Sequence, residues 1–321
     1  MLYPLKLNAA FKDYLWGGTR LRDEFNKKTD INPVAESWEL SCHHDGLSTI
    51  TNGEFAGKTL WDYVQTVGKQ VIGTNAPKDK DFPILIKFID AKQNLSVQVH
   101  PDDSYARVHE GESGKTEMWY VIDATPGASL IYGFTKKISL EEFEQRIKDN
   151  TLLDVCNRVP IKKGDVFFIE AGTLHAIGAG ALIAEIQQSS NSTYRVYDYG
   201  RIGKDGKPRQ LHIEKALAVT KRQPPTHKVG EIAKLTCFTD YDLDVLAQCD
   251  LFKVSHFDLH GECKLNAKKD SFHSILVLAG DIMLTYGENS FTLTKGDSVF
   301  VPADTGKYAL KGNGEFILTT I

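Results

Sequence analysis

Cysteine is scarce in this 321-residue chain, and its cysteines follow no recognisable pattern. They are odd in number, widely scattered and never spaced as Cys-x-x-Cys: Cys42, Cys156, Cys237, Cys249 and Cys263. The arrangement argues against a disulfide framework or a zinc ribbon and favours reduced thiols in the cytoplasm.

Long apolar runs and an excess of basic charge are missing too. No apolar run approaches the roughly 20 residues that a transmembrane helix needs. The first seven residues lack the basic region and apolar run of a secretory signal. Lysine and arginine number 38 against 42 acidic residues, a net charge of −4, so no basic field indicates nucleic acid. These features predict a cytoplasmic protein that binds neither membrane nor nucleic acid.

The patterns that are present divide the chain into two parts. Residues 1–222 read as strands with a short helical insertion near 138–158, where Ser139 begins a capping box. Two consecutive prolines mark a linker at 223–235. From 236 to 321, short strands alternate with turns every 8–12 residues, a spacing typical of a β-sandwich or jelly roll.

A row of polar side chains marks one predicted strand, residues 94–100. Leu95, Val97 and Val99 alternate there with Ser96, Gln98 and His100. One face of the strand is therefore aliphatic, while the other carries a hydroxyl, an amide and an imidazole. A polar row within an otherwise apolar region indicates a metal or a substrate.

Further metal-ligating side chains occur near other strand ends. Glu117 opens the next clear strand, and His175 follows the strand at 165–170. With His100 they supply two imidazoles and a carboxylate, which describe a catalytic zinc site but also suit iron or another first-row metal. Gln98 shares a face with His100 and would be a less usual ligand through its amide oxygen.

An internal repeat connects the two parts of the chain. Residues 164–175 align without a gap to 296–307, and each copy has Gly-Asp, an apolar strand and a turn. Both copies resemble the second motif of the cupin superfamily, which implies a mostly β fold of duplicated cupin or jelly-roll barrels. The second copy has Lys307 in place of His175, and a protonated lysine is a poor metal ligand. We therefore expect the chemistry in residues 1–222 and a metal-free, structural C-terminal copy.

Four segments carry a more specific pattern. They are 96–102 (SVQVHPD), 114–119 (GKTEMW), 171–176 (AGTLHA) and 193–198 (TYRVYD). In this order they resemble the type I mannose-6-phosphate isomerases in their short bacterial form. The resemblance implies a zinc enzyme that interconverts mannose 6-phosphate and fructose 6-phosphate through a cis-enediol.

The same resemblance implies roles for individual residues. One zinc ion would be held by Gln98, His100, Glu117 and His175. Arg195 would be the catalytic arginine, and its planar fork suits an oxyanion. Ser96 and Lys115 would lie close to the substrate, a small sugar phosphate.

The sequence does not identify the residue that acts as the base in proton transfer. Burial would raise the pKa of Glu185, which lies on the predicted strand 181–188, and would make it a base. An ion pair between Glu185 and Arg195 is an equally weighted alternative. Lys115 would serve as a base if its pKa were lowered and as a phosphate ligand otherwise.

Two other functions also stay open. Another metal-dependent cupin enzyme, either a different sugar-phosphate isomerase or a dioxygenase, would use the same two histidines and carboxylate. A non-catalytic sugar-binding cupin is the second alternative. Arg195 and Lys115 favour the isomerase, because they suit a phosphate that most dioxygenase substrates lack. The sequence does not determine the oligomeric state.

Overall fold

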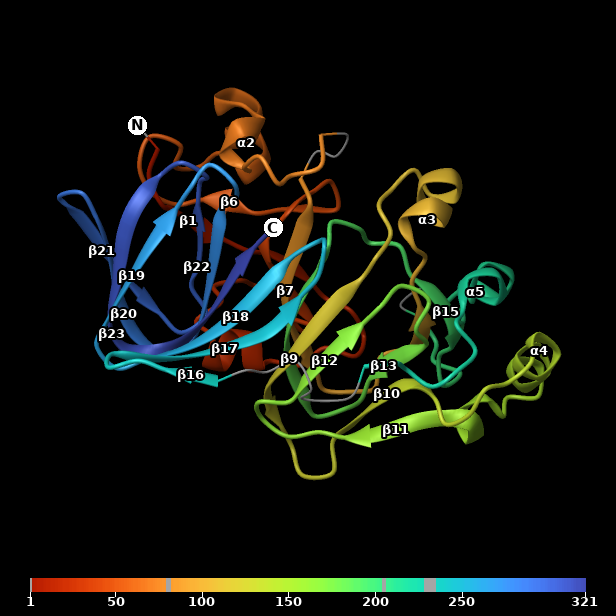
Figure 1. The fold of residues 1–321 in the computed structure, drawn as a ribbon. Helices are drawn as coiled ribbons and strands as arrows, with labels where there is room; N and C mark the ends of the chain where they lie inside the picture. The colour runs from red at the N-terminus through yellow and green to blue at the C-terminus, as the bar shows by residue number, and fades with distance from the viewer. Residues whose placement is uncertain (1, 79–81, 204–205, 228–234) are drawn as a thin grey trace.

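The computed structural model describes residues 2–78, 82–203, 206–227 and 235–321, and its secondary structure is mostly β, as predicted (Figure 1). A six-stranded sheet has the order β12 (Val166–Ile169), β9 (Glu117–Ala124), β14 (Ala181–Gln188), β7 (Ile84–Ala91), β3 (Glu36–Leu40) and β2 (Ala10–Lys12). A five-stranded sheet has the order β11 (Cys156–Pro160), β10 (Ser129–Phe134), β13 (His175–Ile177), β8 (Val97–Val99) and β15 (Tyr194–Tyr197).

These two sheets pack face to face through one apolar cluster. Trp119 and Ile183 come from the six-stranded sheet, while Leu130, Tyr132 and Ile177 come from the five-stranded sheet. Across the described residues the sheets stay open and do not close into barrels. The arrangement is a jelly-roll-like sandwich with a polar region between its layers.

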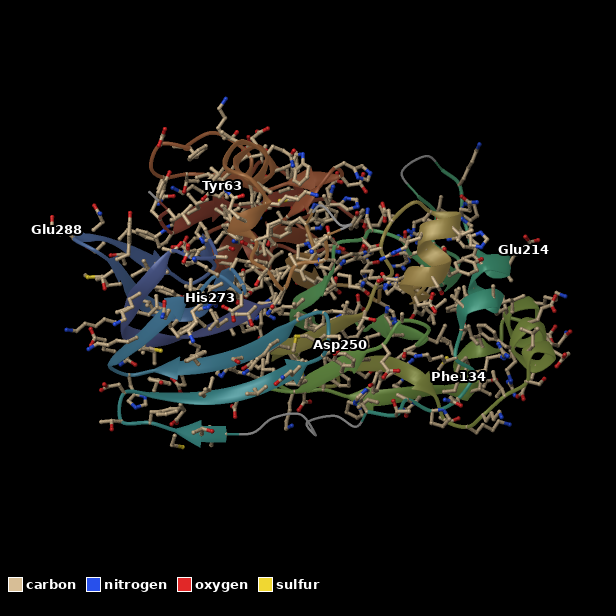
Figure 2. All side chains as sticks on the ribbon, turned by 45° about the horizontal axis from the view of Figure 1, so that its top comes forward. Tyr63, Phe134, Glu214, Asp250, His273 and Glu288 are labelled. Atoms are coloured by element: carbon tan, nitrogen blue, oxygen red, sulfur yellow. The ribbon has the colours of Figure 1, made fainter. Side chains whose placement is uncertain are left out.

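The third sheet holds most of the C-terminal strands, on the left in Figure 1. Its order is β16 (Leu235–Cys237), β17 (Tyr241–Gln248), β18 (Lys253–Leu259), β23 (Gly306–Thr320), β20 (His273–Tyr286), β22 (Ser298–Val301), β1 (Leu5–Asn8) and β6 (Thr49–Ile50). Strand β19 (Glu262–Ala267) pairs with β23, and β21 (Asn289–Thr294) pairs with β20. Figure 2 shows Glu288 at the tip of the β20–β21 hairpin, far from Glu214 at the opposite end of the molecule.

The beginning of the chain completes this C-terminal sheet. Strand β1 lies antiparallel to β22, with Leu5 opposite Phe300. The largest apolar cluster joins Leu5 and Phe88 to Phe252 and Phe300, so one core runs through both parts. The division at 1–222 and 236–321 stays a prediction, and residues 228–234 of the expected linker lie outside the described residues.

The helices lie beside the sheets, and α2, α3 and α4 begin at a side-chain cap. They are α1 (Arg20–Glu24), α2 (Leu60–Val67), α3 (Asp103–His109), α4 (Leu140–Lys148) and α5 (Ile213–Val219), with short 3₁₀ turns η1 (Lys69–Val71) and η2 (Leu152–Val155) and a small ladder β4 (Cys42–His43) with β5 (Gly46–Leu47). The predicted insertion near 138–158 is confirmed by α4, where Ser139 Oγ accepts the Glu142 N–H at 3.0 Å. None of the helices in the described part combines the length and apolar character needed to cross a membrane.

Helix α3 was not predicted, because it lies in a largely polar stretch, 101–116. Asp102 caps this helix by accepting the Tyr105 N–H at 2.9 Å. Only Ala106 is buried, so α3 has no apolar stripe to show a helical period. The capping aspartate was the available signal.

The internal repeat is visible in the backbone. Strands β12 and β22 occupy equivalent positions of the two copies. Gly172 has φ +88°, and the aligned Asp304 has φ +66°. This left-handed conformation suits glycine and is tolerated by aspartate, so the two copies share the same turn.

An ion pair between the two parts gives a test of their joint stability. Glu315 on β23 lies 3.6 Å from His256 Nε2 and 3.1 Å from Lys163 Nζ. His256 and Lys163 lower the pKa of Glu315 from 4.5 to about 2. This contribution is therefore present above about pH 4.5 and is lost as the pH falls towards about 2.

We expect Glu315→Gln to lower the free energy of unfolding by about 1 kcal/mol near neutral pH, with the deficit shrinking below about pH 4.5. Urea denaturation near neutral pH and at about pH 3 measures it, with Glu288→Gln on the exposed hairpin as control. An equal deficit at both pH values would contradict the linkage.

Candidate active site

Three predicted site residues lie side by side on the five-stranded sheet. The register places His175 of β13 opposite Gln98 of β8, and Gln98 opposite Arg195 of β15. Directly opposed residues in an antiparallel pair project to the same face. His100 follows one residue after β8, on the face that Gln98 uses, as the alternation predicted.

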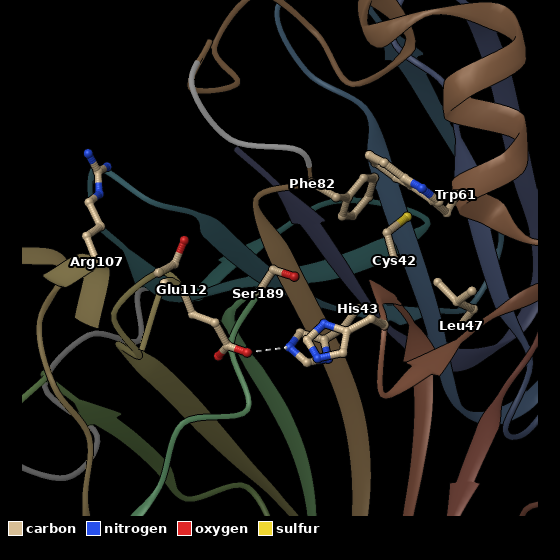
Figure 3. A pocket seen from close by; sticks show the side chains of 11 residues that line it. Cys42, His43, Leu47, Trp61, Phe82, Arg107, Glu112 and Ser189 are labelled. Carbon is tan, nitrogen blue, oxygen red and sulfur yellow. Dashed lines mark hydrogen bonds and ion pairs between the residues drawn. The ribbon is translucent and has the colours of Figure 1, made fainter. Parts of the chain in front are cut away.

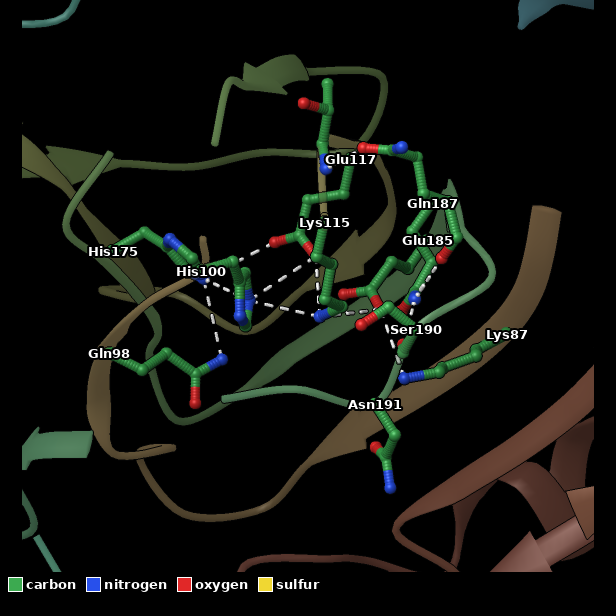
Figure 4. A network of polar contacts seen from close by, with 12 residues as sticks. Lys87, Gln98, His100, Lys115, Glu117, His175, Glu185, Gln187, Ser190 and Asn191 are labelled. Carbon is green, nitrogen blue, oxygen red and sulfur yellow. Dashed lines mark hydrogen bonds and ion pairs between the residues drawn. The ribbon is translucent and has the colours of Figure 1, made fainter. Parts of the chain in front are cut away.

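The six-stranded sheet supplies the facing wall. Glu117 begins β9, and Lys115 lies two residues before it. The register pairs Glu185 of β14 with Lys87 of β7. All four side chains are at least nine-tenths buried: Lys87, Lys115, Glu117 and Glu185. Figure 4 shows these charged groups converging with the two imidazoles.

Backbone carbonyls fix the orientation of both imidazoles. His100 Nδ1 lies 2.9 Å from the Ser192 carbonyl, and His175 Nδ1 lies 2.8 Å from the Thr173 carbonyl. Each Nδ1 therefore donates its proton to a carbonyl, and each Nε2 carries a lone pair, which in His100 accepts from Lys115 Nζ at 3.0 Å. The two Nε2 atoms face each other at 3.1 Å, close to the roughly 3.3 Å between two nitrogens on one tetrahedral ion.

Glu117 and Gln98 complete this cluster. Glu117 Oε1 lies 3.4 Å from His175 Nε2, and Oε2 lies 3.7 Å from His100 Nε2. The Gln98 amide nitrogen lies 3.5 Å from His175 Nε2, and the Gln98 amide oxygen accepts from Ser96 Oγ at 3.3 Å. His100, Glu117 and His175 form a buried group whose ligand atoms could hold one metal ion.

The electrostatics of the cluster fit a divalent cation. Burial lowers the pKa of His175 to about 4 and places that of His100 well below its usual value. Burial, together with the Glu185 carboxylate, raises the pKa of Glu117 to about 7. Glu117 Oε1 accepts no hydrogen bond within the described residues. The other oxygen, Oε2, lies 2.8 Å from Lys115 Nζ. Two neutral imidazoles and a carboxylate are a donor set of a first-row metal.

A cavity of about 310 Å³ opens beside this cluster. Its lining includes the predicted residues Ser96, Gln98, Lys115, Glu185 and Arg195. The Arg195 guanidinium forms no hydrogen bond or ion pair with any residue that the structure describes, so its fork is available to an anion. The cavity therefore offers cations and hydrogen-bonding groups to a small polar ligand.

The expected pKa of Glu185 was wrong. Burial would raise it, but Lys115 and Lys87 outweigh burial, and the pKa of Glu185 lies below its usual value. Its carboxylate lies 3.4 Å from Lys87 Nζ and 3.8 Å from Lys115 Nζ, and it accepts the Trp119 indole N–H at 2.9 Å. Its ion pairs are thus with lysines and not with Arg195.

Sequence reasoning missed two cations that line the cavity. Lys87 lies in a strand that is buried along its whole length, and a lysine within such an apolar run was a signal in itself. Arg209 lies in a loop and donates to Asp198 at 2.6 Å. No periodicity marks Arg209, so only the folded arrangement reveals it.

Lys87 gives a prediction that depends on stability alone. It lies 3.5 Å from Glu36 and 3.4 Å from Glu185, and these carboxylates outweigh burial and raise the pKa of Lys87. Replacing Lys87 with methionine leaves two buried carboxylates without this partner, so we expect the free energy of unfolding to fall by about 3–5 kcal/mol.

Chemical denaturation measures this loss, and Lys92→Met is the matched control because Lys92 is exposed. The control should stay within about 0.5 kcal/mol of the unsubstituted protein. A similarly small change for Lys87→Met would show that the buried ion pairs contribute little.

Comparisons with known proteins agree with this geometry. The family model "Phosphomannose isomerase type I, catalytic domain" matches residues 4–122, and the model "Mannose-6-phosphate isomerase, cupin domain" matches residues 243–321. Together they cover the beginning of the catalytic part and most of the C-terminal β-region.

Several relatives match over nearly the whole chain. A mannose-6-phosphate isomerase of Streptococcus mutans is 38% identical, covering 99% of this chain and 98% of the relative. One from Bacillus subtilis is 37% identical, covering 98% of each. The crystal structure of the mannose 6-phosphate isomerase from Bacillus subtilis superimposes with a TM-score of 0.91 at 37% identity, covering 99% of each chain. The chain therefore belongs to the type I mannose-6-phosphate isomerase family.

Proposed function

We propose that this protein interconverts mannose 6-phosphate and fructose 6-phosphate, with one zinc ion held by Gln98, His100, Glu117 and His175. The observation that carries the proposal is the buried ligand set beside a cavity lined with cations. Family membership supports the reaction, and the donor set of two imidazoles, a carboxylate and an amide supports zinc. All five cysteines are free thiols, which supports a reducing, cytoplasmic setting.

The substrate is a phosphate dianion, and the cavity offers groups that match it. Arg195 presents an unpaired planar fork that can bind two oxyanion oxygens at once. Arg209 lines the same cavity and adds positive charge. Ser96 Oγ lies 3.3 Å from the Gln98 side-chain oxygen, so this hydroxyl can contact both a zinc ligand and a sugar hydroxyl.

The reaction moves a proton between C1 and C2 of the open-chain sugar through a cis-enediol. Zinc, when bound, supplies a Lewis acid that stabilises the negative charge developing on the substrate oxygens. Lys115 and Glu185 lie 3.8 Å apart on one wall of the cavity. We assign proton transfer to this pair, whose charges depend on each other. A proton that one group accepts can be shared with the other, so the pair can return it to the neighbouring carbon.

The first test of the proposal is a coupled assay of mannose 6-phosphate conversion. Protein stripped of metal with a chelator should lose activity and regain it with zinc. His175→Ala removes a ligand, so it should lose both zinc and activity. Arg195→Ala should keep zinc and lose activity, because Arg195 binds substrate and not metal. Zinc binding without turnover in the unsubstituted protein would contradict the proposal and favour a non-catalytic sugar-binding role.

The second test concerns the Lys115–Glu185 pair. We expect Lys115→Met and Glu185→Gln each to lower kcat by about 10²–10⁴, the usual contribution of general acid–base catalysis. Groups that act as a unit are not additive, so the double variant should be no slower than the slower single variant. Steady-state kinetics on zinc-loaded proteins measures this. Independent losses that multiply in the double variant would show separate roles.

A further inference from the structure

A second polar cluster contacts residues 190–192, the segment whose Ser192 carbonyl accepts the His100 Nδ1–H. His43, His44 and Glu112 come together at the wall of another cavity of about 650 Å³. Figure 3 shows the His43 ring facing the Glu112 carboxylate, with Ser189 close by. Two histidines and a glutamate resemble a metal-ligand set, so the state of His43 decides what this cluster can do.

The hydrogen bonds of His43 argue against a metal at this place. The Asp45 backbone N–H donates to His43 Nδ1 at 3.1 Å, so Nδ1 carries no proton. The proton of the neutral ring is therefore on Nε2, which lies 3.2 Å from Glu112 Oε1 and donates to it. A protonated nitrogen cannot ligate a metal. This arrangement is the reverse of that in His100 and His175.

Glu112 collects further donors from one short segment. Its Oε2 atom accepts from Ser190 Oγ at 3.1 Å, from the Asn191 backbone N–H at 3.2 Å and from Ser192 Oγ at 3.1 Å. With His43, four donors converge on one carboxylate, which is an extensive set of charge-assisted hydrogen bonds. They fix the course of residues 190–192 after strand β14.

That segment reaches the metal cluster through one carbonyl. The Ser192 carbonyl accepts the His100 Nδ1–H at 2.9 Å and thereby orients the His100 ring. Glu112 does not touch the cluster itself. It lies in the loop between α3 and β9, which leads to Lys115. Its hydrogen bonds therefore connect this loop to residues 190–192, whose Ser192 carbonyl orients His100.

We propose that Glu112, held by His43, is a positioning residue for the metal ligand His100. It acts by fixing the backbone at Ser192, whose carbonyl sets both the tautomer and the direction of the imidazole. Loss of a direct hydrogen-bond partner of a metal ligand, here the Ser192 carbonyl, typically changes metal affinity or activity by about 10–100-fold, and Glu112 acts through that carbonyl. The inference rests on the proposed function, because it requires a metal at His100.

The test compares zinc affinity in Glu112→Gln and in the unsubstituted protein by competition with a chromophoric chelator. A glutamine has one acceptor oxygen, so either His43 Nε2–H or the Asn191 N–H loses its acceptor. We expect zinc to bind about ten-fold more weakly. The visible spectrum of the Co²⁺-loaded variant should also change, because it reports the ligand geometry.

Two further variants complete the design. His43→Ala leaves the three donors to Oε2 in place, so its loss of affinity should be smaller than that of Glu112→Gln. Glu144→Gln is the matched control, since the partly exposed Glu144 pairs with Lys148 within α4, and it should leave zinc affinity and the Co²⁺ spectrum unchanged. Circular dichroism and thermal melting confirm that each variant is folded, which separates lost positioning from lost structure.

The outcomes separate this inference from the proposed function. If the unsubstituted protein binds zinc and isomerises its substrate while Glu112→Gln and His43→Ala keep its affinity and Co²⁺ spectrum, only the positioning role is wrong. If the unsubstituted protein binds no zinc, the proposed function fails and the positioning role fails with it. A weaker affinity with an altered spectrum in folded Glu112→Gln supports the role.

Discussion

The burial of Glu117 is the constraint on which the site depends. A carboxylate without exposed surface is costly unless cations or hydrogen bonds compensate it. Three buried carboxylates, Glu36, Glu117 and Glu185, share two buried ammonium groups, Lys87 and Lys115. The carboxylates outnumber the ammonium groups by one, and the raised pKa of Glu117 places the uncompensated negative charge on this residue. A divalent cation held by Glu117 and the two imidazoles would supply the positive charge that the lysines do not.

The two-sheet sandwich makes this charge arrangement possible. The five-stranded sheet contributes neutral ligands and Arg195, while the six-stranded sheet contributes the lysines and carboxylates. The buried charges of the six-stranded sheet pair mainly with one another, and the imidazoles of the five-stranded sheet face its Glu117 carboxylate. Beside the polar region the two sheets meet through an apolar cluster, and such low-dielectric surroundings strengthen the polar interactions.

The sequence predicted those parts of the site that follow from alternation along a strand. Gln98 and His100 share a face because side chains alternate, and Glu185 was expected on the strand 181–188, where the structure has it. The pKa predicted for Glu185 was wrong because its pairing with the cross-strand neighbour Lys87 depends on the register between two distant segments. Likewise, the pairing of β1 with β22 brings together segments near the two ends of the chain, and no local sequence pattern predicts it.

The C-terminal repeat shows another solution to the same burial problem. The register places His273 opposite Val301, which is equivalent to Glu117 opposite Ile169 in the first copy. His273 Nδ1 lies 2.8 Å from the Tyr308 hydroxyl, and burial lowers the pKa of His273 to about 4. A neutral histidine and a tyrosine therefore satisfy each other where the first copy holds a carboxylate.

This difference distinguishes two β-regions that share one architecture. The fold fixes the turn and the strand register, and these are the same in both copies. The charge state of the buried position is set by single side chains. A neutral hydrogen-bonded pair needs no further partner, whereas a buried carboxylate beside two oriented imidazoles does. The requirement for a cation therefore lies in the residues of the first copy and not in the β-architecture that the copies share.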